Sequence, residues 1–103
     1  GSSMGKSPTE VLLELIAEAS GTTREEVKEK FLKELRKGKS PTEVLLELIA
    51  EASGTTKEEV KEKFLKELSF GKSPTEVLLE LIAEASGTTK EEVKKKFWKE
   101  LSL

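Results

Sequence analysis

The chain has 103 residues and a mass of 11.4 kDa, and 37% of its residues are charged, with a net charge of −2 at pH 7. This size favours a single domain. The balanced charge excludes a basic surface that would bind nucleic acid or a membrane. The longest apolar run has three residues, which excludes a membrane-spanning helix of about 20. Cysteine, histidine, aspartate and asparagine are all missing, which excludes disulfides, thiolate or imidazole metal sites, EF-hand loops and the usual catalytic triads.

A unit of 33 residues occurs three times without a spacer, over residues 5–37, 38–70 and 71–103. A fixed period of this kind is typical of tandem helical repeats, so we interpret residues 5–103 as a single repeat domain. Residues 1–4 precede the first copy and are interpreted as a tag remnant. The copies differ at only five positions of the unit: Arg24/Lys57/Lys90, Glu29/Glu62/Lys95, Leu32/Leu65/Trp98, Arg36/Ser69/Ser102 and Lys37/Phe70/Leu103.

The first helix of each unit is expected over residues 8–20 in the first copy. Ser7 can accept a hydrogen bond from a free amide of the first turn, and Glu10 is placed to reach back to the Ser7 amide. Pro8 suits the first helical position because its missing N–H would have no partner there. Gly21 should end the helix, since glycine readily takes the left-handed conformation that follows a helix.

The second helix of each unit is expected over residues 24–37. Thr23 and Glu26 repeat the capping pattern at its start, and Gly38 should end it. The loops, Gly-Thr and Gly-Lys, have two residues each, which makes consecutive helices antiparallel neighbours. The sequence therefore predicts an all-α fold of six helices, arranged as three helix–loop–helix repeats.

The two helices of a unit differ in how much of their surface is apolar. The first is apolar around most of its circumference, which predicts an inner helix that packs on several sides. The second has a narrow apolar stripe, widened by Leu32, and is expected to lie outside. The core is expected to contain Leu12, Leu15, Ile16, Val27, Phe31, Leu35 and their copies.

Glutamates form a stripe along the first helix at Glu10, Glu14 and Glu18. One interpretation is a central channel in which the copies of this stripe concentrate cations. The other is a solvated helix face, and the sequence favours it because charged stripes usually face water. On the second helix, Glu26 and Lys30 have the spacing of a stabilising ion pair.

The ends of the repeat array are not capped. Terminal repeats normally carry a polar outer face, yet the first helix is identical in all three copies. Joining two ends that each expose on the order of 500 Å² of apolar surface would gain up to ~25 kcal/mol, against a few kcal/mol of loop-closure entropy. We therefore expect a monomeric, pseudo-threefold ring in which Leu103 lies next to Gly5, with domain-swapped or self-associated forms as alternatives.

Identical 33-residue helix–loop–helix units, two-residue loops and uncapped ends resemble the computationally designed closed α-helical tandem-repeat toroids, and among them a left-handed ring of three repeats. The resemblance covers residues 5–103. It implies left-handed bundle winding, a synthetic origin with no natural compartment, and a soluble protein in the cytoplasm of an expression host. The signature patterns of natural tetratricopeptide and ankyrin repeats are missing from the sequence.

The expected function is that of a de novo designed structural scaffold with no natural biochemical activity. We expect no enzyme activity, no catalytic, cofactor-binding or metal residues, no cofactor, and no protein, nucleic-acid or membrane partner. The alternative is an open α-solenoid that binds a peptide or protein, but the variation along one face that such modules need is missing. Residues 38–40 have only the ending of a phosphate-binding loop. Trp98 is interpreted as an absorbance handle rather than a binding anchor, since it stands alone.

Overall fold

The computed structural model describes residues 5–103, and over that range the chain forms six α-helices of 12 or 13 residues. The expected tag remnant lies outside the described residues. The all-α prediction is confirmed, and the helices follow one another at regular spacing. They are α1 (Pro8–Ser20), α2 (Arg24–Arg36), α3 (Pro41–Ser53), α4 (Lys57–Ser69), α5 (Pro74–Ser86) and α6 (Lys90–Leu101).

The ends of α1 are set by the residues that the sequence singled out. The Glu10 N–H donates to Ser7 Oγ over 3.1 Å, and Pro8 occupies the first turn. Gly21 follows the helix with φ of 71°, a left-handed conformation that a side chain would strain. The predicted bounds of α1 are therefore confirmed. The predicted hydrogen bond from the Ser7 N–H back to the Glu10 side chain is wrong, since the Glu10 carboxylate lies 3.7 Å from Lys28 Nζ of α2 instead.

The start of α2 has the full capping box that the sequence predicted. The Glu26 N–H donates to Thr23 Oγ1 over 3.1 Å, and the Thr23 N–H donates back to Glu26 Oε1 over 3.4 Å. The helix ends at Arg36, one residue earlier than expected. The Lys37 N–H bonds to the carbonyl oxygen of Glu34, three residues back, over 3.1 Å, which tightens the last turn before the loop.

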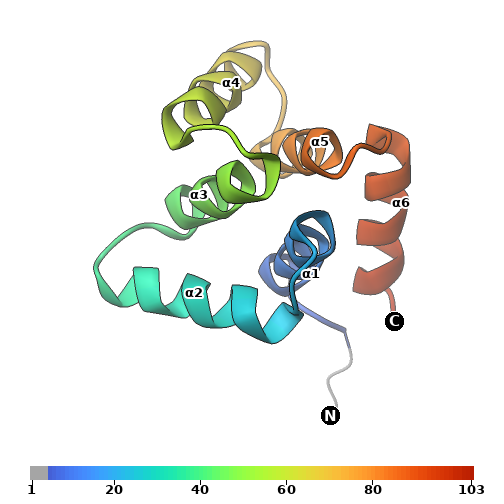
Figure 1. The fold of residues 1–103 in the computed structure, drawn as a ribbon. Helices are drawn as coiled ribbons and strands as arrows, with labels where there is room; N and C mark the ends of the chain where they lie inside the picture. Colours follow the sequence, from blue (N-terminus) through green and yellow to red (C-terminus); the bar gives the residue numbers. More distant parts are fainter. Residues whose placement is uncertain (1–4) are drawn as a thin grey trace.

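The helices form an inner and an outer layer (Figure 1). The inner helices α1, α3 and α5 each pack against the other two. Each outer helix packs against two inner ones: α2 against α1 and α3, α4 against α3 and α5, and α6 against α5 and α1. The last helix of the chain therefore packs against the first. The radius of gyration is 13.1 Å, the size of a compact domain of this length.

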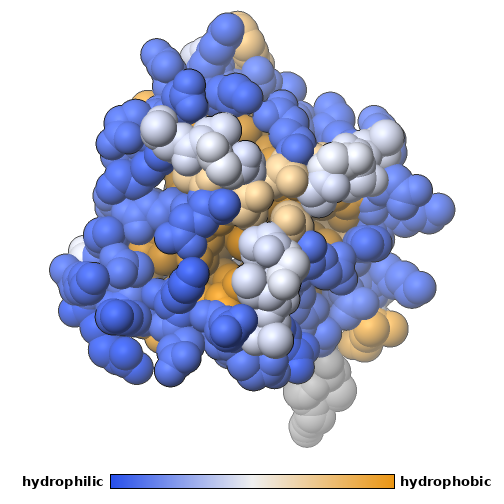
Figure 2. All heavy atoms as spheres, in the orientation of Figure 1, coloured by the Kyte–Doolittle hydropathy of each residue, from blue (hydrophilic) through white to orange (hydrophobic). Residues whose placement is uncertain are grey.

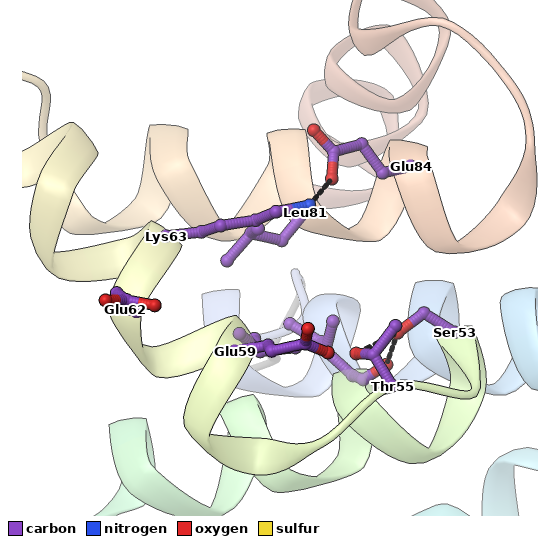
Figure 3. A pocket seen from close by; sticks show the side chains of 9 residues that line it. Ser53, Thr55, Glu59, Glu62, Lys63, Leu81 and Glu84 are labelled. Carbon is purple, nitrogen blue, oxygen red and sulfur yellow. Dashed lines mark hydrogen bonds and ion pairs between the residues drawn. The ribbon is translucent and has the colours of Figure 1, made fainter.

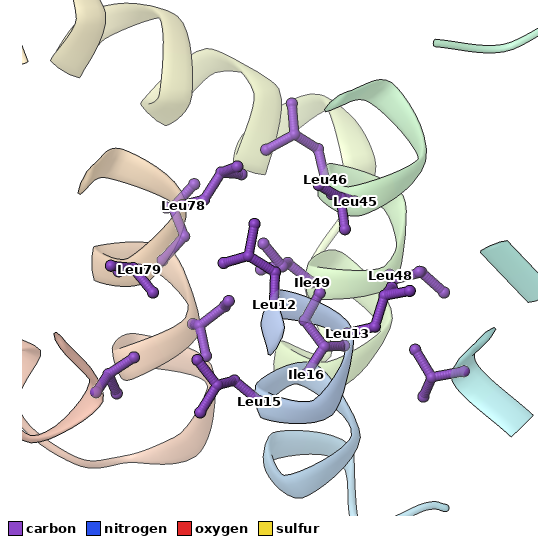
Figure 4. Close-up of a cluster of buried hydrophobic side chains, with 14 of the residues drawn as sticks. Leu12, Leu13, Leu15, Ile16, Leu45, Leu46, Leu48, Ile49, Leu78 and Leu79 are labelled. Carbon is purple, nitrogen blue, oxygen red and sulfur yellow. The ribbon is translucent and has the colours of Figure 1, made fainter. Parts of the chain in front are cut away.

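One apolar core joins all of these helices (Figure 4). Each inner helix buries six side chains and each outer helix two. In the first repeat the buried side chains are Val11, Leu12, Leu13, Leu15, Ile16, Ala17, Val27 and Phe31. The same positions are buried in the other two repeats. The predicted core is confirmed, except that Leu35 and its copies are only partly buried at its edge.

The outer helices bury a narrower stripe than the sequence predicted. Leu32, Leu65 and Trp98 are 44%, 58% and 60% exposed, so the expected widening of the stripe by Leu32 is wrong. Each step along a helix turns the side chain by about 100°, which carries this position away from the buried phenylalanine before it. Phe70 is also exposed.

The described ends of the chain lie side by side. A Cβ atom added to Gly5 would come within 2.9 Å of the Leu101 carbonyl oxygen and 3.7 Å of the Leu103 oxygen. The expectation that Leu103 lies next to Gly5 is therefore confirmed. Hydrophilic side chains cover most of the rim of the face in Figure 2, and hydrophobic ones show near its centre. Within residues 5–103, no helix has the length and apolar character needed to cross a membrane.

Candidate functional site

The acidic stripe of the inner helices was the main candidate for chemistry in the sequence. In α1 the three glutamates meet bases from different elements: Glu10 lies 3.7 Å from Lys28, Glu14 is 2.8 Å from Arg24, and Glu18 is 3.2 Å from Lys96. Across residues 5–103 no three acidic side chains gather into a group that could hold a metal ion. The interpretation as a cation channel is therefore wrong.

The middle glutamate of each inner helix is more enclosed than a solvated face would allow. The Glu14 side chain is only 15% exposed. Each such carboxylate binds two cations, one from the loop before its own helix and one from the first residue of the following outer helix. The groups are Glu14 with Lys6 and Arg24, Glu47 with Lys39 and Lys57, and Glu80 with Lys72 and Lys90, at N–O distances of 2.8 to 3.2 Å.

These contacts keep the glutamates ionised. Partial burial alone would raise the pKa of Glu14, but hydrogen bonds from Lys6 and Arg24 outweigh it and hold the pKa below its usual value. Hydrogen bonds from Lys39 and Lys37 lower the pKa of Glu34 to about 2. A general acid or base works best with a pKa near the operating pH, so these shifts run opposite to what such catalysis needs.

Ion pairs between repeats recur at equivalent positions, including between the last repeat and the first. Lys30 reaches Glu51 of the next repeat over 3.2 Å, so the expected pair with Glu26 within the helix is wrong. The equivalent pairs are Lys63–Glu84 and Lys96–Glu18, both at 3.2 Å. A second set comprises Lys39–Glu34 at 2.7 Å, Lys72–Glu67 at 2.6 Å and Lys6–Glu100 at 3.0 Å. The first and last repeats thus meet through the same pairs as successive repeats.

Shallow grooves open where the loop inside one repeat meets the inner helix of the next. The largest, about 440 Å³, lies between α3, α4 and α5 (Figure 3). Ile49 and Leu81 form its apolar floor, and the 3.2 Å pair of Lys63 with Glu84 crosses its rim. Grooves of about 220 and 210 Å³ occupy the equivalent places in the described chain. Equivalent residues line all three grooves, and the charged side chains at their rims are already paired. These grooves therefore offer little to distinguish one ligand from another.

A different groove, of about 490 Å³, lies at the third repeat between α5, α6 and the start of α1. Trp98, Phe97 and Leu101 of α6 line it together with Leu79 of α5 and Pro8 of α1. Sequence reasoning treated Trp98 as an absorbance handle and missed this groove. The signal in the sequence was the replacement of leucine by tryptophan in the third copy alone, at Leu32/Leu65/Trp98.

Comparisons with known proteins add no family to this description. No family model matches the chain, and no curated protein matches it. A function for the chain therefore has to be argued from its repeats, its ion pairs and its grooves.

The substitution Glu47→Gln is expected to lower the free energy of unfolding by about 1–2 kcal/mol at pH 7, since it leaves two cations without their shared carboxylate. The matched control Glu51→Gln, on the same helix, removes one exposed pair and should cost under ~0.5 kcal/mol. The pKa of Glu47 is lowered from 4.5 in the folded protein, so its contribution is complete above that pH and is lost as the pH falls through the folded pKa. Urea denaturation from pH 7 down to about pH 3 should show the cost of Glu47→Gln shrinking. Equal costs for the two variants would contradict a special role for Glu47.

Proposed function

We propose that the chain is a de novo designed structural scaffold: a closed, pseudo-threefold ring of three helix–loop–helix repeats with no natural biochemical activity. The observation that carries this proposal is the ion pair of Lys6 with Glu100, whose atoms lie 3.0 Å apart although 94 residues separate them in the chain. This ion pair is equivalent to the 2.7 Å pair of Lys39 with Glu34, which joins the first and second repeats. An open array would have no such pair between its first and last repeats.

The packing of the helices supports closure in the same way. The contact of α6 with α1 is equivalent to the contact of α2 with α3 and to that of α4 with α5. The contact of α1 with α5 completes the set between α1 and α3 and between α3 and α5. These contacts favour the ring over the open solenoid, whose terminal flanks would face water. We include left-handed winding of the bundle in the proposal because the sequence resembles the designed left-handed toroids.

The near-identity of the repeats supports a structural role. A binding module needs one face that differs from the rest, and a general acid or base works best with a pKa near the operating pH. Here the inner helices are identical in sequence, and the enclosed glutamates each serve as ionic bridges between helices. We therefore assign no enzyme activity, cofactor, metal or biological partner to the chain, and no natural compartment.

A circular permutant tests the ring directly. In this variant Leu103 is joined to Gly5, and the chain begins at Lys39 and ends at Gly38. Because the new ends fall in a loop equivalent to the joined one, we expect the free energy of unfolding to stay within ~1 kcal/mol of the parent. Light scattering of this permutant, which lacks residues 1–4, should give a constant mass slightly below the 11.4 kDa of the full chain across a wide concentration range.

The matched control is a permutant opened inside α3, between Leu46 and Glu47, with the same joined ends. It breaks an inner helix and should lose most of its stability. A loss of several kcal/mol in the loop permutant, or a mass that climbs with concentration, would favour the open solenoid instead.

A further inference from the structure

The third repeat carries an open aromatic ring that the other two repeats lack. Trp98 occupies a position of α6 where the first and second repeats have Leu32 and Leu65. Its side chain is 60% exposed, so much of the indole lies in water. The outer helix that bears it packs against both α5 and α1 (Figure 1). The indole therefore stands beside the surface where the last repeat meets the first.

The indole forms one wall of the groove of about 490 Å³ between α5, α6 and the start of α1. Leu79 and Phe97 also line this groove, and each is only 1% exposed, so they are held firmly by the core. The Phe97 ring meets Trp98 edge-on, with ring centroids 5.2 Å apart. Leu101 and Pro8 complete an apolar slot. Sites for small molecules usually enclose about 300–1,000 Å³, and this groove falls in that range.

The charged side chains of the groove compensate each other. Its lining residues include one base and one acid, Lys94 and Glu76, and the Lys94 Nζ lies 3.8 Å from the Glu76 carboxylate. The equivalent pair of Lys28 with Glu10 in the first repeat spans 3.7 Å, so this pairing belongs to the repeat itself. An ionic ligand would have to compete with the pair, whereas an uncharged ligand leaves it intact.

Two uncharged hydroxyl groups at the start of α5 line the same groove, those of Ser73 and Thr75. Ser73 Oγ accepts a hydrogen bond from the Glu76 N–H over 3.2 Å, and a hydroxyl can donate a hydrogen bond as well as accept one. The groove thus combines apolar walls with neutral groups that can bind one polar substituent of a ligand.

We propose that this groove binds small, uncharged, planar aromatic molecules that carry a hydroxyl group, such as naphthols. The ligand ring packs against Trp98 and the buried residues beside it, where ring–ring contact adds to the burial of apolar surface. The ligand hydroxyl bonds to Ser73 or Thr75. A second copy of the chain fits the groove less well, because nine residues line it, whereas a specific protein interface has about 20–30 residues on each side. This inference goes beyond the scaffold role and does not depend on it.

The probe for the first experiment is 2-naphthol, titrated into the full chain at neutral pH and followed by the indole N–H resonance in NMR spectra. Trp98 is the single tryptophan, so the signal needs no assignment. We expect a saturable shift with a Kd on the order of 1 mM, the same at low and at high salt. The absence of a saturable shift would overturn the site.

Two charged analogues test the choice of an uncharged ligand. Naphthalene-2-sulfonate and 2-naphthylmethylammonium have the same rings and carry opposite charges. Each should bind at least ~3-fold more weakly than 2-naphthol, because the charged group loses water beside an ion pair that is already complete. Binding of either analogue that equals or exceeds that of 2-naphthol would overturn the assigned ligand class.

Two variants measure what the indole contributes. Trp98→Leu restores the residue of the other copies and should abolish saturable shifts at the backbone amides of Ser73 and Thr75, which line the groove. Trp98→Phe keeps an aromatic ring and should weaken binding only about 3-fold. The position is exposed, so circular dichroism should show an intact fold in both variants. Equal affinities of the two variants would show that an aromatic wall is not needed, which contradicts the proposal.

The repeats also allow the site to be built a second time. Leu65 is exposed on α4, Phe64 and Leu46 are buried as their copies are in the third repeat, and Pro74 takes the place of Pro8. The single variant Leu65→Trp should therefore give two indole resonances that shift with similar Kd values and a binding stoichiometry of two. A second indole that never responds to 2-naphthol would contradict the proposal.

The matched control is Phe70→Trp, which adds an indole at an exposed position that does not line the groove. Its resonance should show no saturable shift over the concentrations that saturate Trp98. If this indole bound 2-naphthol with the same Kd, any exposed indole would suffice, and the groove would not be the binding site.

Discussion

Replacement of Ile82 with alanine is expected to destabilise the protein by the same ~2–4 kcal/mol as replacement of Ile16 or Ile49. All three side chains are buried. Each shares an interface with a leucine of the following repeat: Ile16 with Leu48, Ile49 with Leu81, and Ile82 with a leucine of the first repeat. In a closed ring these three interfaces are equivalent, so each cavity should cost the same within about 0.5 kcal/mol.

An open array makes a different prediction for the same variants. The flank of the third repeat would then face water, and Ile82→Ala would remove a side chain that is already partly hydrated, at a cost of under ~1 kcal/mol. Guanidinium denaturation of the three variants at one pH, with the slopes compared as well as the midpoints, separates the two cases. The control is Leu32→Ala, at an exposed position of an outer helix, which should change the free energy of unfolding by less than ~1 kcal/mol. A cost for Ile82→Ala far below that for Ile49→Ala would contradict the ring.

The bounds of the helices could be predicted because their signals are local. A serine followed by a proline starts each inner helix, and a glycine with positive φ ends it, so Pro8–Ser20 was predicted to the residue. The end of α2 was missed by one residue because the last turn tightens onto the Glu34 carbonyl oxygen, which no residue type announces. The core followed from periodicity alone, since the same positions are buried in each repeat.

The partners of the charged side chains could not be predicted, because sequence spacing reveals only neighbours within one helix. Lys30 has a glutamate four residues before it, yet it pairs with Glu51 of the next repeat. Glu14 was interpreted as part of a solvated helix face. In the structure Lys6, in the loop before its helix, and Arg24, the first residue of the next helix, both pair with its carboxylate. Both errors arise because neighbouring helices bring bases within reach of these carboxylates, which a single-helix view leaves out.

The groove at Trp98 was missed for a related reason. Its walls come from α1, α5 and α6, which are far apart in sequence and meet only because the last repeat packs against the first. The replacement of leucine by Trp98 in the third copy was visible in the sequence. What the sequence could not provide was the neighbouring surface, including Pro8, that turns an exposed indole into the wall of a slot.

A fully buried position of the core sets the second large effect. The substitution Val44→Asp is expected to lower the free energy of unfolding at pH 7 by more than any other substitution considered, because Val44 is 0% exposed and the core around it is apolar. The matched variant Val44→Asn buries an uncharged polar side chain of the same shape as aspartate. It should lower the free energy of unfolding by about 3–4 kcal/mol. An aspartate held charged there should cost about 4 kcal/mol more, equivalent to a pKa raised by ~3 units. That total is a large part of the ~5–15 kcal/mol that stabilises most domains.

The two variants should respond differently to pH, and in the opposite direction to Glu47→Gln. A raised folded pKa means that the neutral aspartic acid is favoured in the core, so stability lost at pH 7 returns as the pH falls through that pKa. The stability of Val44→Asp should therefore approach that of Val44→Asn between about pH 7 and pH 4, while Val44→Asn keeps a constant gap from the parent. Urea denaturation followed by circular dichroism at several pH values measures both gaps. If Val44→Asp matched Val44→Asn at pH 7, water would have to reach this position, and the core around Val44 would not be dry.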